Sequence, residues 1–203
     1  MVILDLYKYS KKNFFYNFII ERFLKIDVHL LKKDFLYIDN IDLGFEENIF
    51  YEYYKNNPAT KWGGNKRERD HYQSNHDLQK NYNFKKPVKV LERYLNKKIK
   101  KKIIPIKMIG QFKIKSMWFT IQQQNEKHSS HNHPKSILSG ISYFKIDEKR
   151  GGELIIDKKD DKIKYMPKKN DLVIFNSDTM HSVEPYHGNN DRIAVAWDAI
   201  YSL

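Results

Sequence analysis

The sequence predicts a mainly β protein with helices in its N-terminal half. After Pro105, short runs rich in β-branched and aromatic residues recur at intervals of roughly ten residues. Turn sequences such as Gly151-Gly152 and the loop 187–191 separate these runs. The expected strands are 116–122, 137–146, 153–156, 171–175, 182–184 and 192–197. Short strands at this spacing favour a β-sandwich or a small barrel.

An amphipathic helix is expected from Pro87 onward, because proline suits the first helical turn. Apolar residues then recur every three or four positions along one face, at Val88, Leu91, Leu95 and Ile99. The lysine-rich run 97–102 is expected to form a solvated helix face. Further upstream, residues 46–56 have helical spacing and 35–38 have strand composition. We expect residues 1–105 to form an α/β extension that packs on a β core of residues 106–203, together in one structural domain.

Composition restricts the chemistry that is available to the chain. Its 203 residues include no cysteine, so a bound metal must take nitrogen or oxygen ligands. A net charge of +12 raises nucleic acid as a partner, but the abundant Lys, Asn, Ile, Tyr and Phe are also the residues that AT-rich codons favour. The apolar stretch 14–20 is too short and too polar for a membrane span or a signal sequence. We therefore expect a soluble cytoplasmic protein.

Three histidines stand at spacings typical of a metal site. His131 and His133 lie two residues apart, and in an extended strand such residues point to the same face. His181 follows the expected strand 171–175 and a turn-like segment, so it can approach from the opposite side. Imidazole is a common ligand of first-row metals, and a set of protein ligands that leaves positions open is typical of non-haem Fe(II).

Arg192 begins the last expected strand, eleven residues after His181. A guanidinium that points into a barrel needs an anionic partner, and it matches a carboxylate with two parallel hydrogen bonds. A hydroxyl of Tyr143 or Ser139 is a candidate to share that carboxylate. Taken alone, Arg192 would fit a surface ion pair with a neighbouring acid, Asp191 or Glu184. Its distance from His181 favours the site.

Other residues have simpler explanations. Glu153 and Asp157 are expected to be solvated acids rather than ligands. The aromatic residues expected in the barrel core are Trp118, Tyr143 and Trp197. The histidines expected at the surface are His71, His76 and His187. The charged loop 66–69 is a candidate to cover the barrel mouth.

The chain resembles a known family from about residue 116 onward, and more weakly from 62 to 100. The matching segments are His131-x-His133-Pro134-x-Ser136-x-x-Ser139-Gly140-x-x-Tyr143, Gly152-Glu153-Leu154, Asp171-Leu172-Val173-Ile174-Phe175, His181-x-Val183 and Arg192-Ile193-Ala194-Val195, with Gln73-Ser74-x-x-x-Leu78 and Trp118 upstream. They resemble the 2-oxoglutarate- and Fe(II)-dependent oxygenases related to prolyl 4-hydroxylase. The resemblance implies a double-stranded β-helix, which is a jelly-roll or cupin-like barrel.

The resemblance also implies roles for individual residues. His131 would be the first ligand of a His-x-Asp/Glu pair, His181 the distal ligand, and Arg192 the anchor of 2-oxoglutarate. The second position of the pair is His133 instead of a carboxylate. Either His133 completes a three-histidine iron site, which we favour, or the position is vacant, or His128 joins the set through a bend at Ser129-Ser130.

The expected function is that of an Fe(II)- and 2-oxoglutarate-dependent dioxygenase that uses O₂ to hydroxylate a protein or a small molecule. A nucleic-acid substrate is a less favoured alternative, because the lysines are spread along the chain. A non-catalytic, cupin-like metal-binding module is the alternative from a different class. The sequence leaves the substrate and the oligomeric state open.

Overall fold

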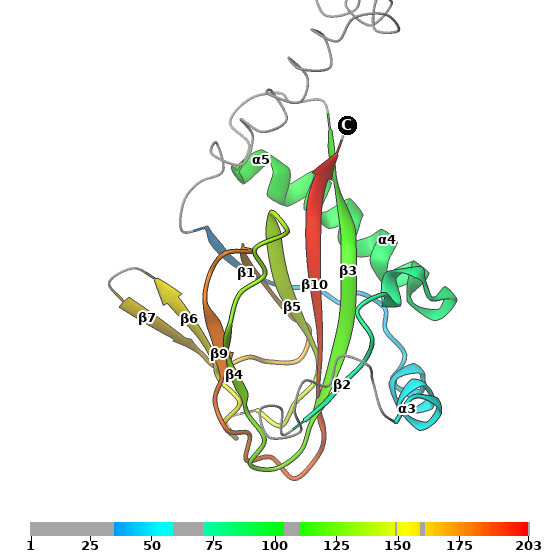
Figure 1. The fold of residues 1–203 in the computed structure, drawn as a ribbon, viewed down its shortest axis with the longest axis vertical. Helices are drawn as coiled ribbons and strands as arrows, with labels where there is room; N and C mark the ends of the chain where they lie inside the picture. Colours follow the sequence, from blue (N-terminus) through cyan, green and yellow to red (C-terminus); the bar gives the residue numbers. More distant parts are fainter. Residues whose placement is uncertain (1–34, 59–70, 104–109, 149, 159–160, 203) are drawn as a thin grey trace, which may run out of the picture.

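Two antiparallel β-sheets face each other in the computed structural model, which describes residues 35–58, 71–103, 110–148, 150–158 and 161–202 (Figure 1). The larger sheet has the order β1-β8-β5-β10-β3-β2 and the smaller sheet the order β4-β9-β6-β7. The strands of the larger sheet are β1 (Leu36–Asn40), β2 (Tyr72–Gln73), β3 (Gln111–Gln122), β5 (Leu138–Lys145), β8 (Asp171–Asn176) and β10 (Arg192–Ser202). Those of the smaller sheet are β4 (His128–His131), β6 (Leu154–Lys158), β7 (Asp161–Tyr165) and β9 (His181–Val183). The fold is therefore a jelly-roll, as predicted.

Helices cover the outer face of the larger sheet, beside β3 and β10 (Figure 1). They are α3 (Glu47–Asn56), η1 (Leu78–Lys80), η2 (Tyr82–Phe84), α4 (Lys85–Tyr94), the π-helical η3 (Leu95–Ile99) and α5 (Lys100–Ile103). The predicted apolar face is confirmed, since Leu91, Leu95 and Ile99 are fully buried. Asn96 ties this layer to β3, because its side chain both donates to and accepts from the backbone of Phe112, at 3.0 and 2.8 Å.

The strand β10 divides its side chains between the two faces of the larger sheet. Ile193, Val195 and Trp197 belong to the core that lies under the helices. Ala194 and Ala196 line a cavity between the two sheets, on the same side as Arg192. This alternation is the period-two pattern of a strand that is covered on both faces. It leaves small side chains in the middle of the inner face, where the cavity lies.

The N-terminal part of the chain contributes strands to the larger sheet as well as helices. β1 pairs with β8 and β2 pairs with β3, both antiparallel. The strand expected at 35–38 and the helix expected at 46–56 are confirmed. The boundary at residue 105 stays a prediction. The loop 66–69 and the stretch 14–20 lie outside the described residues.

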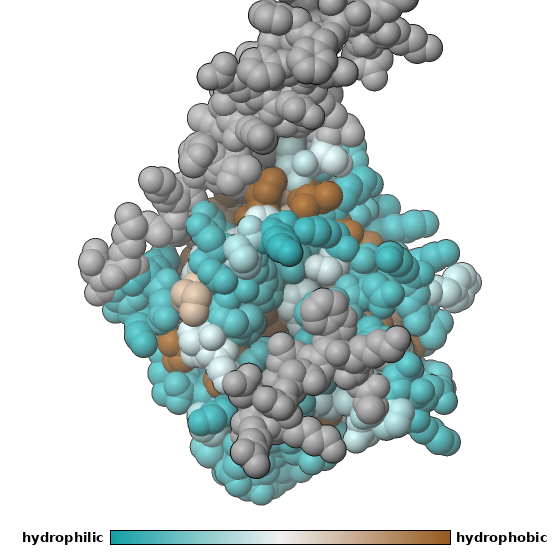
Figure 2. Space-filling view, viewed as in Figure 1, coloured by the Kyte–Doolittle hydropathy of each residue, from teal (hydrophilic) through white to brown (hydrophobic). Residues whose placement is uncertain are grey.

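The molecular surface is mostly hydrophilic on the face that Figure 2 presents, apart from scattered apolar residues. Scattered apolar side chains are usual on a folded protein and do not by themselves mark an interface. Within the described ranges, no helix has the length and hydropathy needed to span a membrane.

Candidate metal centre

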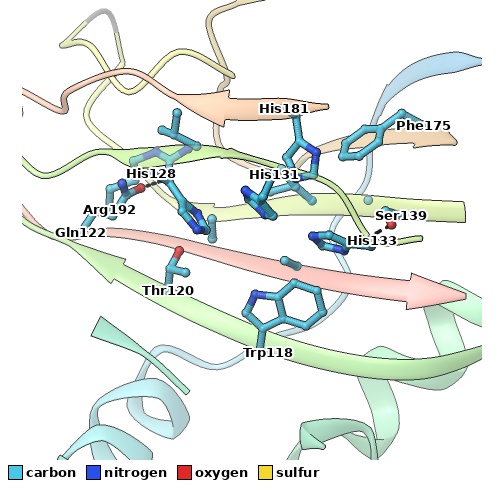
Figure 3. A pocket seen from close by; sticks show the side chains of 15 residues that line it. Trp118, Thr120, Gln122, His128, His131, His133, Ser139, Phe175, His181 and Arg192 are labelled. Atoms are coloured by element: carbon cyan, nitrogen blue, oxygen red, sulfur yellow. Dashed lines mark hydrogen bonds between the residues drawn. The ribbon is translucent and has the colours of Figure 1, made fainter. Parts of the chain in front are cut away.

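Three histidines converge between the two sheets (Figure 3). One nitrogen from each of His131, His133 and His181 lies within 4.8 Å of those of the other two. The ring centroids of His131 and His181 are 4.3 Å apart, and that of His133 is 5.1 and 5.2 Å from them. Such spacings suit a metal ion bound by all three rings, because metal–imidazole bonds of about 2.0–2.1 Å keep ligand nitrogens close together.

One detail of the predicted geometry is wrong. His131 ends β4, so His133 does not lie in the same strand. The chain turns at this point because Pro134 follows, and the backbone N–H of His133 donates to the carbonyl of Ser177 at 2.7 Å. The two rings nevertheless face a common centre. The turn after β4, and not strand periodicity, places His133 there.

The hydrogen bonds of the rings orient all three for metal binding. Nδ1 of His131 lies 2.9 Å from the carbonyl oxygen of Ser129, and Nδ1 of His181 lies 3.0 Å from that of Thr179. Nδ1 of His133 lies 2.6 Å from Oδ1 of Asp198. Carbonyl and carboxylate oxygens only accept, so each Nδ1 carries the proton and the lone pair is on Nε2. This is the arrangement typical of metal-bound histidine.

The environment of His181 keeps its ring neutral. Burial, followed by the nearby His131, lowers the pKa of His181 to about 3. The side chain is 4% exposed, and its ring also packs on Phe175, with centroids 4.7 Å apart. An unprotonated ring in an apolar setting can bind a metal without first losing a proton.

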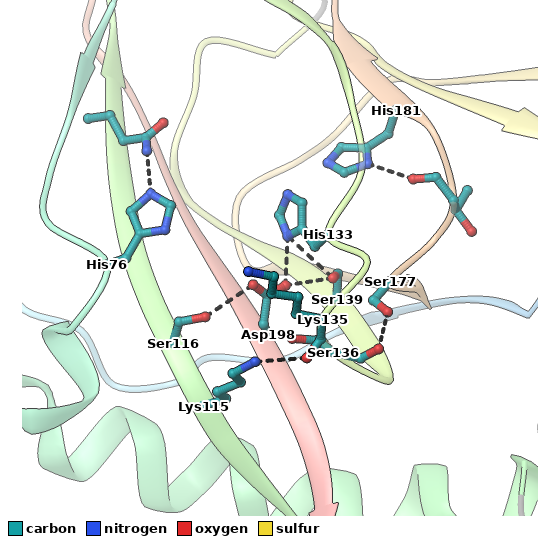
Figure 4. A network of polar contacts seen from close by, with 12 residues as sticks. His76, Lys115, Ser116, His133, Lys135, Ser136, Ser139, Ser177, His181 and Asp198 are labelled. Atoms are coloured by element: carbon teal, nitrogen blue, oxygen red, sulfur yellow. Dashed lines mark hydrogen bonds and ion pairs between the residues drawn. The ribbon is translucent and has the colours of Figure 1, made fainter. Parts of the chain in front are cut away.

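Asp198 orients His133 through a hydrogen bond with Nδ1 of the ring (Figure 4). Its carboxylate accepts hydrogen bonds from His133, from Ser139 at 2.6 Å and from Ser116 at 3.0 Å. Burial alone would raise the pKa of Asp198, but these donors outweigh it and the net pKa is lowered. The group is therefore an anion.

Arg192 lies at the opposite end of the same cavity, 1% exposed. Its guanidinium donates to the side-chain oxygen of Gln122 and to the carbonyl of Gly152, and it lies 5.1 Å from the ring centroid of Tyr143. The surface ion pair considered above does not form, since no ion pair links Arg192 to an acid of the described part. Burial lowers the pKa of Arg192, yet a guanidinium stays charged in proteins.

Polar atoms without partners surround this guanidinium. Arg192 Nε, Gln122 Nε2 and the Tyr143 hydroxyl are buried and lack hydrogen-bond partners among the described groups. Burial raises the pKa of Tyr143 to about 12, so its hydroxyl stays protonated and can donate. Buried donors left unmatched are costly, and a carboxylate is the kind of acceptor that such donors match. The donor set therefore fits an anionic carboxylate ligand in the same cavity as the three histidines.

The other expected site residues have different positions. The Ser139 hydroxyl donates its hydrogen bond to Asp198, so it lies near the histidines and not beside Arg192, where it was expected to share a carboxylate. His128 stacks on His131 with centroids 4.4 Å apart but does not belong to the three-histidine group. The acids Glu153 and Asp157 instead pair with Lys164 and Lys162.

The expectation that His71 is a surface residue is wrong. His76, also expected at the surface, is only partly exposed. His71 is 9% exposed because it packs against the ring of His128, at 4.6 Å. His76 is partly buried and stacks on Trp118, with centroids 4.2 Å apart and planes within 5°. His187 is exposed, as expected. Trp118, Tyr143 and Trp197 are buried, and Trp118 also lines the cavity.

An outer pocket of about 290 Å³ adjoins the metal centre. Trp118 and His133 line both this pocket and the inner cavity. The remaining lining residues are His76, Lys115, Ser116, Asn132, Pro134, Lys135, Ser136 and Asp198. The pocket therefore gives a second molecule access to the histidine side of the site, while Arg192 lies at the other side.

Sequence reasoning missed Asp198 and Gln122. A signal for Asp198 was available, since it has the same strand parity as Arg192 and is the one polar residue within the apolar run 193–200. Gln122 carries no such signal. Its role depends on register, because it is the β3 residue paired with Arg192.

Comparisons with known proteins agree with this geometry. Residues 116–198 match the family model described as "Putative 2OG-Fe(II) oxygenase". None of the curated proteins matches the sequence. A Pseudomonas putida prolyl-4-hydroxylase has a similar structure, with a TM-score of 0.60 at 13% identity over 87% of this chain and 98% of that one.

Two further prolyl hydroxylases share the fold. One, from Trichoplax adhaerens, is in complex with a peptide fragment of the hypoxia inducible factor oxygen degradation domain; its TM-score is 0.59 at 13% identity, over 94% of both chains. The other is the viral collagen prolyl hydroxylase of Paramecium bursaria Chlorella virus-1 in complex with 2-oxoglutarate; its TM-score is 0.53 at 21% identity, over 82% of this chain and 97% of that one. At these identities the likeness concerns the fold alone. The segment that carries the three histidines and Arg192, residues 116–198, is the part of the chain that matches the model of this oxygenase family.

Proposed function

We propose that the protein is an Fe(II)- and 2-oxoglutarate-dependent dioxygenase that hydroxylates a polypeptide, with iron held by His131, His133 and His181. One observation carries the assignment of the co-substrate. Arg192 is a buried cation at one end of a cavity whose middle holds three converging histidines, and no described acid pairs with it. A dicarboxylate that reaches from the metal to the guanidinium would satisfy both ends.

The residues of the site have separate roles in this proposal. Bound iron, 2-oxoglutarate and O₂ supply oxidative hydroxylation, in which one oxygen atom enters a substrate C–H bond and the other enters succinate as CO₂ leaves. The three rings present Nε2 to the metal. Arg192 binds the distal carboxylate, while Gln122 and the Gly152 carbonyl fix the plane of its guanidinium. The apolar side chains of Phe175 and Val183 line the cavity and limit water around the iron.

The polypeptide substrate is supported by the outer pocket. A pocket of about 290 Å³ that opens beside His133 is near the lower size limit of ligand sites, enough for one side chain with its flanking backbone. The stacked rings of Trp118 and His76 are both part of its lining. The structural relative from Trichoplax adhaerens is in complex with a peptide, which favours a polypeptide over a small molecule.

Anaerobic titration with 2-oxoglutarate tests the co-substrate site. Wild-type protein loaded with Fe(II) should develop the weak visible charge-transfer band of the chelate. His181→Ala protein should not, because it lacks a ligand. His187→Ala is the matched control, since this ring is exposed, contacts the side chain of Asn125 and does not line the cavity. Iron binding by wild-type protein without any band would reject the dioxygenase in favour of a metal-binding module.

A substrate screen tests the polypeptide proposal separately. The Fe(II)- and 2-oxoglutarate-loaded enzyme is exposed to O₂ with either short peptides of randomised sequence or the twenty free amino acids. Mass spectrometry should detect the gain of one oxygen atom in peptides only. Oxygen transfer to free amino acids alone, or to neither pool although the chelate forms, would contradict a polypeptide substrate.

A further inference from the structure

The three histidines differ in the group that accepts the hydrogen bond from Nδ1. His131 and His181 each donate through Nδ1 to a backbone carbonyl two residues earlier in the chain. His133 donates instead to a carboxylate, that of Asp198, at 2.6 Å. Among the three rings of the group, His133 is thus the one with an anionic partner. It is also the one that stands where the related oxygenases are expected to have an acid.

Asp198 is built into the sheet more firmly than a surface acid would be. Its Cα partners are Ser116 on β3 and Ser139 on β5, so it sits in the middle of a rung of three strands. Both serine hydroxyls donate to it, at 3.0 and 2.6 Å. The residue is 8% exposed. Both of its oxygens accept hydrogen bonds, which hold the carboxylate in one orientation toward His133.

The position of the Asp198 carboxylate matters because of the charge balance of the metal centre. A site of two histidines and one carboxylate neutralises half the charge of Fe(II), whereas three neutral imidazoles neutralise none. A buried positive charge left without compensation is costly. A carboxylate hydrogen-bonded to a ligand histidine raises the basicity of that ring and fixes its orientation.

We propose that Asp198 is the positioning residue of this metal centre: through His133 it supplies, from behind the ligand, the negative charge that the three-histidine set lacks. This inference rests on the metal centre proposed above. Ser116 and Ser139 hold the carboxylate in place. Asp198 itself does not touch the metal.

A double-mutant cycle with Co(II) tests the inference without relying on activity. The four proteins are wild type, Asp198→Asn, His133→Asp and the double variant, and the measurement is the Co(II) dissociation constant from visible absorption. Asparagine keeps the shape and one acceptor oxygen but removes the charge. In the wild-type background, Asp198→Asn should weaken Co(II) binding about 10- to 100-fold, the usual range for partners of metal ligands.

The His133→Asp background should behave differently. There the carboxylate is a metal ligand itself, so the charge of Asp198 becomes redundant, and Asp198→Asn should leave Co(II) affinity unchanged or increase it. Equal weakening in both backgrounds would mean that Asp198 only supports the fold, and would overturn the inference. Wild-type affinity in Asp198→Asn would overturn it too, while leaving the dioxygenase proposal intact. No Co(II) binding by wild-type protein would remove the centre and the inference together.

A measurement on wild-type protein covers the case in which Asp198→Asn does not fold. Nitrogen NMR of the histidines in Zn(II)-loaded protein should find His133 bound through Nε2, with the proton retained on Nδ1. Binding through Nδ1 would be incompatible with the contact to Asp198 and would overturn the inference.

Discussion

His131 on β4 and His181 on β9 are directly paired across an antiparallel ladder, although fifty positions separate them in the chain. Among the described strands, β4 lies at the edge of the smaller sheet, with β9 as its one neighbour there. Its ladder with β9 is also interrupted by a bulge between His128 and His131. A metal bound to both rings would therefore cross-link an edge that backbone pairing holds weakly.

Metal binding should accordingly stabilise the fold. At a free Co(II) concentration about 100 times its dissociation constant, the expected gain is about 2.7 kcal/mol, or roughly 5–10 °C in Tm. Differential scanning fluorimetry with and without Co(II) measures it. The shift should vanish in His181→Ala and persist in His187→Ala. A shift that survives in His181→Ala would place the metal elsewhere.

Arg192→Met should impair the binding of 2-oxoglutarate much more than that of the metal. Methionine fills a similar volume but removes charged hydrogen bonds worth about 1.5–3 kcal/mol, so the half-saturating 2-oxoglutarate concentration should rise about 10- to 100-fold. Co(II) affinity should stay near that of wild type, because Arg192 lies at the far end of the cavity from His133. Equal losses of both affinities would indicate a general collapse of the site.

Gly140→Ala should destabilise the protein by about 1–3 kcal/mol, an overpacking cost. A Cβ atom at this position would lie 2.2 Å from Cζ2 of Trp197, whose side chain is fully buried, so the surrounding core would have to shift. Urea unfolding measures the loss. Ser142→Ala, on the same strand, is the control: its buried hydroxyl has no partner among the described groups, so the change should stay within about 0.5 kcal/mol. Equal effects of the two substitutions would contradict the contact.

Asp39 should make stability depend on pH in the acid range. The Tyr94 hydroxyl and Lys98 donate to it, and these contacts, against partial burial, lower its pKa to about 2. A lowered pKa means that the contribution is complete above pH 3.8 and is lost as the pH falls toward 2. Because Lys98 is exposed, we expect about 1 kcal/mol or less at pH 7.

The comparison protein for this prediction is Asp39→Asn, which has no charge at any pH. Its unfolding free energy should be lower than that of wild type at pH 7, and the difference should narrow as the pH drops below 4. A constant difference from pH 7 to 3 would assign the effect to packing rather than to charge.

Local patterns predicted most of the strands, though not β2 or β7, together with the apolar face of α4 and the group of His131, His181 and Arg192, because periodicity and spacing are properties of neighbouring residues. The contacts that complete the site were not predictable in this way. Asp198 reaches His133 only because β10 is inserted between β5 and β3. Which strands become neighbours is decided by packing of the whole barrel, and one sequence does not reveal that register.

The inner face of β10 sets the spacing between Arg192 and Asp198. Arg192 is at one end, Asp198 is six residues along, and the two alanines between them leave the space that the cavity occupies. At about 3.3 Å per residue, the strand fixes roughly 20 Å between the anchor of the co-substrate and the support of the metal ligand. Insertion or deletion of one residue between them would turn one anchor out of the cavity while the other stayed in place. With the roles proposed above for Arg192 and Asp198, one stretch of backbone would set both the length of the bound acid and the position of the metal, and the two would have to change together.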